Sequence, residues 1–529
     1  MSTRNKKNKS GSNEKIQKPN KATSKPKSDK ISKSSKTTSK SGSNDKPKKS
    51  KRSISRVDAD KTVDADKAVS ADKAVSTKIT EDKKEYITDK KILPISIKLP
   101  NINNSIFEHD ADVLFSGNID YPRSEYGFHH FIHNNKNKTE VLSKFEGKKR
   151  IYLVFNKYER YVDDHEESIG NISKASFTQG DRPDIISRGF YKLWEILMLF
   201  NVVNTTDNNF VSVHLAEGEG SFLQAVMFFR DKYGNKGVSK NDKYYLASVR
   251  PEDVGGKEHI PKLNKDFVKY YEKDKSKRVI LGKTQTGGGK STLYGGDIQE
   301  KADLITGDGS FDWINENIQE QEAFRLIIAQ ITTGIKMQKK GGAFVCKFFE
   351  TFTKTSLKII TILCELYDNV YFVKPLTSRL SNSEKYAVCK GFKYNDKDKQ
   401  FKVITTKLDN LLGELRKNTK EQINDIFANY SVDRSLVIPM IEMNREISNP
   451  QLKIIGQIIT FVENEVYSGD EYHDNREEQI NCSKYWTDTY LPSTIQRNVY
   501  DKILDSSLKI SNDKTNELAQ ILVTVSSQK

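Results

Sequence analysis

The chain has 529 residues, more than one ordinary domain, and its 35% hydrophobic and 30% charged residues describe a soluble protein that is not all core. No uninterrupted apolar run approaches the roughly 18 residues that a membrane helix needs, and the start of the chain is polar. We therefore expect neither a membrane span nor a targeting segment, and an intracellular location.

The positive charge of the chain is concentrated at its start. Residues 1–56 contain 19 Lys and Arg against 3 Asp and Glu, an excess of 16 that equals the formal net charge of the whole chain. The remaining residues are therefore formally neutral. Such a Lys/Ser-rich segment buries too little apolar area to offset its conformational entropy, so we expect a disordered basic tail. A salt-sensitive tether to nucleic acid is compatible with that tail.

A low-complexity linker is predicted at residues 57–90, where valines recur six residues apart, a spacing that fits no helix period. The cysteines do not have the spacing of a metal or disulfide framework, so reduced core thiols are expected. They are Cys346, Cys364, Cys389 and Cys482.

The folded part is predicted to begin near residue 91, with an N-terminal extension over 91–180. A catalytic domain is expected over 181–395. In chain order the apolar runs predict strands and helices as follows: a strand at 150–155, a buried helix at 192–200, strands at 210–216, 244–249 and 303–307, a helix at 318–337 that stops at 339–342, and strands at 343–348, 369–374 and 386–390. Alternating strands and helices predict a doubly wound α/β sheet with helices on both faces.

Residues 396–529 are predicted to form a helical C-terminal extension, because apolar residues recur there at helical spacing. The positions are Leu408, Leu411, Leu412, Leu415, Ile454, Ile455, Ile458, Ile459 and Val462. Core packing is the usual role of such faces, and no chemistry is visible in this part of the sequence.

Four charged residues stand at the edges of apolar runs: Lys192, Asp308, Lys347 and Glu384. Ionised side chains are rarely buried unless they are paired, so four of them on core elements suggest a site. Taken singly, Lys192 fits a helix residue that extends to solvent, Glu384 a helix cap and Asp308 a turn. Lys347 is the hardest to dismiss, because it interrupts a strand that is apolar on both faces.

A glycine-rich loop follows the first predicted strand of the sheet at residues 214–222. Gly218 and Gly220 allow backbone amides to approach a ligand, and Glu217 suits an amino or hydroxyl group better than a phosphate. This turn is the usual place for a nucleotide-like cofactor in a doubly wound sheet.

Two other motifs are interpreted as structural. Residues 286–292 end like a phosphate-binding loop, but position 284 is Thr where that motif requires Gly, so a surface loop is favoured over an NTPase site. The segment at 129–133 has the two histidines of a zinc helix but His130 in place of the glutamate. No metal site is predicted.

In chain order, SRGFYKLWEIL, HLAEGEGSF, GGDI, DLITGDGSFD, NENIQE, GGAFVCKFFETFT and VKPLTSRLSNSEKYAVCKGF resemble the FtsJ-type RNA ribose 2′-O-methyltransferases. Within that family the chain is similar to the cap-specific mRNA branch of eukaryotes and large DNA viruses. The resemblance covers about residues 185–393, and it implies a Rossmann-like methyltransferase sheet. The family's Lys-Asp-Lys-Glu tetrad falls on Lys192, Asp308, Lys347 and Glu384.

The resemblance implies S-adenosyl-L-methionine as the cofactor, held by Glu217, Gly218 and Gly220 at its methionine part, by Asp297 at its adenosine and by Asp308. The family usually has Gly-Pro-Gly-Gly where this chain has residues 218–221, Gly-Glu-Gly-Ser, which bears on cofactor affinity.

The expected chemistry needs positioning and one base. Lys347 is predicted to be that base, which requires its pKa to fall below the usual value of about 10.4. Lys192 is predicted to orient the hydroxyl and stabilise the oxyanion, while Asp308 and Glu384 hold the lysines.

RNA contacts are predicted after the sixth strand and beside Lys192. The candidates are Arg188, Tyr191, Lys374, Ser378 and Arg379. The expected partner is the capped 5′ end of mRNA, with other capping or transcription proteins as further partners, and with host cytoplasm or virion as the location if the chain is viral. A ribosomal or transfer RNA substrate, a weak homologue that only binds RNA, and an NTPase at 286–292 stay open, as does the oligomeric state.

Overall fold

The computed structural model describes residues 92–122, 125–162, 165–177, 183–248, 263–273, 278–281, 300–310 and 315–508. The predicted tail and linker, the loop at 286–292 and Asp297 lie outside these residues. The predicted domain limits stay predictions.

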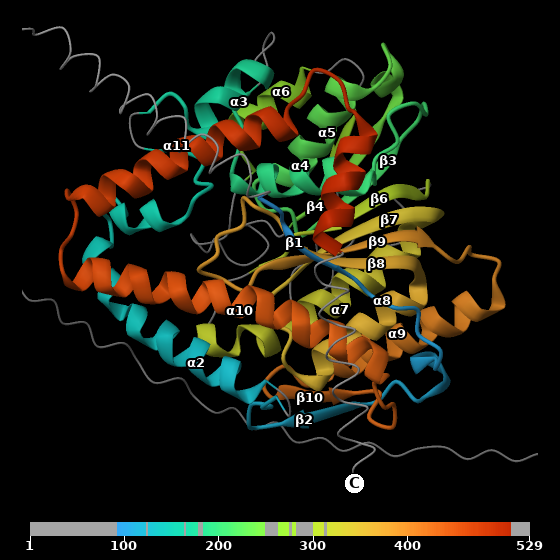
Figure 1. Ribbon diagram of the computed structural model, residues 1–529. Helices are drawn as coiled ribbons and strands as arrows, with labels where there is room; N and C mark the ends of the chain where they lie inside the picture. Colours follow the sequence, from blue (N-terminus) through green and yellow to red (C-terminus); the bar gives the residue numbers. More distant parts are fainter. Residues whose placement is uncertain are drawn as a thin grey trace, which may run out of the picture. The chain divides into compact units, whose positions relative to one another are not determined.

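An eight-stranded sheet forms the centre of the described part, in the order β1-β8-β9-β7-β6-β3-β4-β5 (Figure 1). The strands β3, β4, β5, β6 and β7 pair in parallel, whereas β9 runs antiparallel between β7 and β8, and β1 runs antiparallel on the edge at β8. Their bounds are β1 Ile95–Lys98, β3 Val211–Leu215, β4 Lys243–Ala247, β5 Val279–Leu281, β6 Ala302–Gly307, β7 Gln338–Phe348, β8 Tyr367–Lys374 and β9 Lys385–Phe392.

Helices cover both faces of this sheet, so the predicted doubly wound fold is confirmed (Figure 1). One face carries α7, α8 and α9, and the other carries α4, α5, α6 and α11. The α-helices are α2 Tyr126–Asn137, α3 Ile169–Phe177, α4 Arg188–Phe200, α5 Ser221–Tyr233, α6 Lys265–Glu272, α7 Gln319–Met337, α8 Lys354–Leu366, α9 Lys399–Lys417, α10 Arg434–Glu463 and α11 Asp470–Tyr490.

Short helices and a small sheet complete the described part of the chain. The 3-10 helices are η1 Ile106–Glu108, η2 Lys138–Phe145, η3 Ile151–Phe155, η4 Val238–Asn241 and η6 Glu316–Ile318. A two-stranded antiparallel sheet joins β2 (Val113–Ser116) to β10 (Gln422–Ile426). None of the helices in the described ranges is long and apolar enough to cross a membrane.

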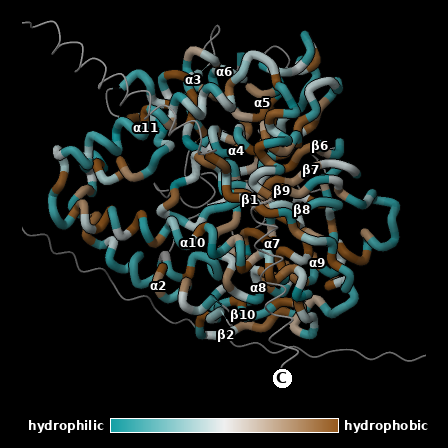
Figure 2. Tube along the Cα trace, viewed as in Figure 1, coloured by the Kyte–Doolittle hydropathy of each residue, from teal (hydrophilic) through white to brown (hydrophobic). Residues whose placement is uncertain are grey.

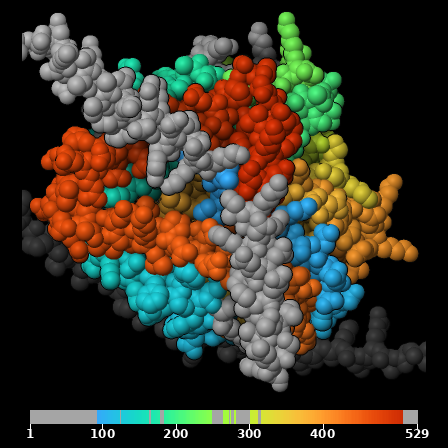
Figure 3. Space-filling model, in the orientation of Figure 1, coloured from blue at the N-terminus to red at the C-terminus, as the bar shows by residue number. Residues whose placement is uncertain are grey.

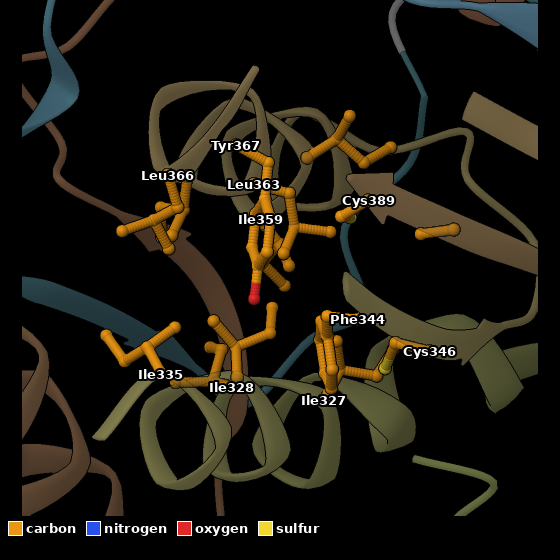
Figure 4. Packing of buried hydrophobic residues seen from close by; sticks show 14 of the residues in the cluster. Ile327, Ile328, Ile335, Phe344, Cys346, Ile359, Leu363, Leu366, Tyr367 and Cys389 are labelled. Carbon is orange, nitrogen blue, oxygen red and sulfur yellow. The ribbon is translucent and has the colours of Figure 1, made fainter. Parts of the chain in front are cut away.

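Hydrophobic segments of the chain gather at the centre of the described part, and hydrophilic segments lie around them (Figure 2). Apolar side chains of α7 and α8 meet those of β7, β8 and β9 in a densely packed layer (Figure 4). Residues there include Ile328, Phe344, Leu363 and Cys389. All four cysteines are buried and free, which confirms the prediction of core thiols.

Most predicted elements are confirmed, and two details are wrong. The run at 150–155 forms the 3-10 helix η3, not a strand, because it has no strand partner and instead buries Val154 and Phe155 against α10. The expected helix over 318–337 does end at Met337, but the next strand begins earlier than the predicted residue 343: residues 339–342 belong to β7, which starts at Gln338. A short apolar run alone does not separate a strand from a buried helix.

One fully buried ion pair joins the segments around the first parallel strands. Arg230, on α5, donates from Nε and Nη2 to both carboxylate oxygens of Asp242 at 2.8 and 2.7 Å, and Tyr244 donates to the same carboxylate at 2.8 Å. Arg230 also donates to the backbone carbonyl of Asp207 at 2.8 Å. These contacts connect the end of α5 to the starts of β3 and β4.

We expect Arg230→Met to lower the free energy of unfolding by about 3–5 kcal/mol, because it leaves the Asp242 charge buried without a partner. Urea denaturation measures this change. Lys243→Met is the control, since its pair with Glu300 is 44% exposed on both sides and should contribute less than about 1 kcal/mol. Equal effects of the two substitutions would contradict the assignment.

Candidate active site at the carboxyl ends of β6, β7 and β9

The alternation of side chains along the strands directs three of the predicted charges toward α4. Val345 on β7 and Tyr386 on β9 face the core beneath α4, and Lys347 lies two residues after Val345. Lys347 pairs in register with Tyr386, two residues after Glu384. Asp308 directly follows β6 and stands in phase with Leu304, which also faces α4. The charges therefore gather on the face that α4 covers.

Two ion pairs connect these charges. Lys347 Nζ lies 3.1 Å from Asp308 Oδ1 and donates to the Asp308 backbone carbonyl at 2.9 Å. Lys192 Nζ, from α4, lies 2.7 Å from Glu384 Oε1. Tyr386 donates its hydroxyl to Asp308 Oδ1 at 3.2 Å. The structure thus brings all four predicted residues together as two lysine–carboxylate pairs.

The two pairs form one electrostatic cluster. Burial acts to raise the pKa of Glu384, but the charges of Lys192 and Lys347 lower it to about 2. Ser378 adds a hydrogen bond, donating to Glu384 Oε1 at 2.9 Å. Glu384 is therefore ionised across the neutral pH range and responds to both lysines.

Gln330 on α7 supports the turn that contains Asp308, and sequence reasoning missed it. Its Oε1 accepts from the Gly309 amide at 3.2 Å, and a Cβ built on Gly307 would come within 2.6 Å of the same oxygen. A glycine at position 307 thus allows this close approach. The available signal was a polar residue within the buried apolar side of α7, between Ile327 and Ile331.

Glu195, one turn after Lys192 on α4, holds the segment that follows β8. Its carboxylate accepts from Leu376 N at 2.7 Å, Thr377 N at 2.9 Å and Trp486 Nε1 at 3.0 Å. Burial raises its pKa to about 6, against the lowering effect of these donors. Glu195 therefore connects α4, α11 and the loop between β8 and β9.

Lys374, a predicted RNA contact, supports the same loop from inside. It is only 2% exposed. Its Nζ donates to Ser378 Oγ, to both oxygens of Asn382 and to the Glu384 backbone carbonyl, at 2.9–3.2 Å. Burial lowers its pKa to about 7, although Glu384 acts in the opposite direction. The ammonium group is thus enclosed by its own loop.

The other predicted RNA contacts differ in exposure. Tyr191 is buried and shares a hydrogen bond of 2.8 Å with Ser173, and Ser378 is buried beside Glu384, so neither reaches the surface. Arg188 and Arg379 both bind Glu159, at 2.7 and 2.8 Å, and their side chains remain 19% and 31% exposed. Only the two arginines stay accessible.

The glycine-rich loop presents one unsatisfied carboxylate oxygen beside the quartet. Glu217 Oε1 accepts from the amides of Phe222 and Leu223 at the start of α5, whereas Oε2 is buried and has no hydrogen-bond partner within the described residues. Burial raises the pKa of Glu217 to about 8; the nearby Asp308 also raises it, and the Leu223 amide lowers it. A cationic ligand group at Oε2 would remove this penalty, so the loop fits a cofactor with an ammonium group.

The loop conformation depends on its glycines, and one of its two departures from the family pattern has a partner. Gly218 and Gly220 have φ of 62° and 102°, which favours glycine at both positions. Ser221, where the family usually has Gly, lies 2.6 Å by its hydroxyl from that of Ser187, the N-cap of α4. The departure from the family pattern thus connects the loop to the helix that carries Lys192.

The histidines at 129–133 are held by protein groups. His133 Nε2 lies 2.9 Å from Glu350 Oε2. His129 is buried, and burial together with the neighbouring His133 lowers its pKa to about 4. Within the described ranges, no group of three or more His, Cys, Asp or Glu could hold a metal ion.

Part of the chain matches a known protein family. Residues 185–392 match the family model described as FtsJ-like methyltransferase. The match covers less than half of this chain, and within it the chain resembles the FtsJ-like methyltransferases. The four charged residues and the glycine-rich loop all lie within the matched range.

Curated proteins similar to this part of the chain are named as cap methyltransferases. Cap-specific mRNA (nucleoside-2′-O-)-methyltransferase 1 of Mus musculus is 31% identical over 35% of this chain, and the human protein is 30% identical over 35%. A Caenorhabditis briggsae relative, also 30% identical, is named inactive cap-specific mRNA (nucleoside-2′-O-)-methyltransferase 1B. The match spans about a fifth of the length of these relatives, 22% in each of the three.

Solved structures add only a distant likeness to the methyltransferase domain. A ribosomal RNA methyltransferase from Plasmodium falciparum aligns with a TM-score of 0.27 at 18% identity, over 40% of this chain and 99% of that chain. Human methyltransferase-like protein 13 in complex with SAH aligns with a TM-score of 0.23 at 12% identity, over 43% of this chain and 93% of that chain.

We expect Glu217→Gln to stabilise the methyltransferase domain by about 2–4 kcal/mol at pH 8 and not at pH 4. Between about 4.5 and 8 the folded state retains a proton that the unfolded chain releases, so wild-type stability falls as pH rises through this window. Glutamine has no such dependence. Urea denaturation across pH measures the difference, with the exposed neighbour Glu219→Gln as the control. A pH-independent difference would refute the assignment.

We expect Lys374→Met to open the loop between β8 and β9, because the carbonyls of Asn382 and Glu384 lose their donor. Hydrogen exchange of the amides at 375–384 should quicken about tenfold or more. Lys390→Met, a partly exposed position on β9, serves as the control. Unchanged exchange in Lys374→Met would show that the ammonium is dispensable.

Proposed function

We propose that this chain is an S-adenosyl-L-methionine-dependent RNA ribose 2′-O-methyltransferase that acts on the cap-proximal nucleotide of mRNA. The observation that carries the proposal is the intact pairing of Lys347 with Asp308 and of Lys192 with Glu384, next to the unsatisfied Glu217. The names of the curated relatives favour a cap substrate over ribosomal or transfer RNA.

Glu217 Oε2 would hold the ammonium group of the cofactor, and the amides of Gly218 and Gly220 would lie along its methionine part. Asp308 and Asp297 complete the proposed cofactor contacts, although Asp297 lies outside the described residues. When bound, S-adenosyl-L-methionine supplies an electrophilic methyl group on a sulfonium centre. The remaining steps belong to side chains of this chain.

Lys347 would accept the proton of the ribose 2′-hydroxyl as the methyl group is transferred to the oxygen. Asp308 contacts Lys347 Nζ through its carboxylate and its carbonyl, which fixes the direction of Nζ. Lys192, held by Glu384, would stabilise the developing negative charge on the oxygen.

Accessible cations for the RNA backbone are Arg188 and Arg379 at the loop after β8. Partner capping or transcription proteins remain a prediction. The reported relatives come from animals, so they give no support to a viral origin.

A homologue that binds RNA without catalysis is the second candidate, because one relative of similar identity carries the word inactive in its name. The intact quartet of this chain favours the enzyme.

We expect Lys347→Ala to lower methyl transfer to capped RNA by about 10²–10⁴-fold. Transfer of tritium from labelled cofactor to capped, uncapped and 2′-O-methylated capped RNA measures the rate and the substrate. The control is Lys339→Ala, a lysine on the same strand that is 57% exposed and paired with Asp303. Calorimetric titration with the cofactor shows whether each variant stays folded.

Full activity of Lys347→Ala would eliminate this residue as the base. Cofactor binding by the wild-type protein with no transfer to any RNA would favour the second candidate. Equal transfer to capped and uncapped RNA would contradict the cap assignment.

A further inference from the structure

Helix α2, in the extension before the matched domain, has an exposed row of side chains on one side. Tyr126, His130, Asn134 and Lys138 follow one another at four-residue spacing through α2 and its C-cap, and all four are exposed. Tyr126 is 54% exposed, and Phe131 beside the row is 60% exposed. We call these five residues the α2 row.

The rings of the α2 row are ordered as a stacking surface. Tyr126 and His130 lie 6.0 Å apart between ring centroids with planes at 18°, and Tyr121, which is 53% exposed, lies 6.3 Å from Tyr126. Asn134 Nδ2 lies 2.9 Å from His130 Nε2, which fixes the histidine ring. Rings held in this way can stack an additional base without losing much conformational entropy.

The segment that contains these rings has an excess of positive charge, although the chain after its basic tail is formally neutral. Residues 126–150 contain six Lys and Arg against two Glu. The exposed cations among them are Lys138, Lys144, Lys148, Lys149 and Arg150. Exposed aromatic rings followed in the same segment by exposed cations are the chemistry of a surface for single-stranded nucleic acid.

The side of α2 next to the α2 row is attached to the candidate active site. His133 and Lys136 lie 2.9 and 2.6 Å from the two oxygens of Glu350, three residues after Lys347. Ser383, directly before Glu384, donates to Glu350 at 3.2 Å. His129 meets Phe352 edge to face at 5.8 Å and lies against Tyr126 of the row, with ring centroids 6.5 Å apart. The α2 row is therefore connected through its own helix to the residues that follow β7.

We propose that the α2 row binds unpaired RNA bases by stacking, with the adjacent lysines on the phosphates. The helix rises by about 1.5 Å per residue, so the row from Tyr126 to Lys138 is about 18 Å long and accommodates several stacked nucleotides at about 3.4 Å each. Figures 1 and 3 show α2 at the surface alongside α10. The proposal rests on the RNA substrate proposed above, and it assigns a contact outside the range that the family model matches.

Fluorescence anisotropy with a labelled 12-nucleotide unstructured RNA, capped or uncapped, tests the proposal with the full chain. We expect Tyr126→Ala to weaken binding about tenfold, Tyr126→Phe to bind like the wild type, and Lys138→Ala to reduce the salt dependence by about one ion. A duplex RNA of the same length should show no effect of Tyr126→Ala, because its bases are not available. Val403→Ala, 51% exposed on α9, is the control.

A loss with capped RNA alone would identify the stacked base as the cap guanine, and a loss with both RNAs would identify a transcript base; either supports the proposal. Unchanged binding of the unpaired RNA by Tyr126→Ala, or an equal loss on duplex RNA, would overturn it. Calorimetric titration with S-adenosyl-L-methionine separates the two proposals. If Tyr126→Ala still binds both RNA and the cofactor, only the proposal for the α2 row is contradicted. If the wild-type protein binds no cofactor, the proposed function is contradicted.

Discussion

The pairing of buried charges is the constraint on which the rest of this structure depends. Two lysines and two carboxylates meet at the carboxyl edge of the sheet, where their side chains are 7–23% exposed, so each charge is partly desolvated and is stabilised by its partner. Each lysine has its own acid, so the quartet is formally neutral. The surrounding polar groups can be understood as supports for this arrangement: Gln330 beneath the Asp308 turn, Glu195 and Lys374 around the loop that leads to Glu384.

The extensions on both sides of the matched domain contribute to the same support. The N-terminal extension supplies Glu159, which holds Arg188 and Arg379, and α2, which binds Glu350. The C-terminal part supplies Trp486 on α11, which donates to Glu195. The carboxylates of Glu159, Glu350 and Glu195 in these contacts are buried, and they make the loop between β8 and β9 dependent on parts of the chain that are far away in sequence.

The sequence predicted the sheet and the quartet because both leave local signals. A charge that interrupts an apolar strand, as Lys347 does, is visible without coordinates, and the alternation of side chains then decides the face. The same criterion would have selected Glu195, an acid inside an apolar helix, and it was missed. Lys374 could not be placed, because a lysine before Pro375 is typical of a surface loop and only the path of residues 376–384 encloses it. The 3-10 helix at 151–155 depends on packing against α10, which no local pattern encodes.

The carboxylate of Glu159, which Arg188 and Arg379 share, limits how strongly this edge of the protein attracts an anion. Two guanidinium groups with one carboxylate between them present a net charge of +1 rather than +2. An incoming phosphate would have to share Arg379 with an internal competitor that is already aligned. Attraction at this edge is therefore short-ranged and geometric, selecting anions that can reach the fork of the guanidinium group over those that are merely more highly charged.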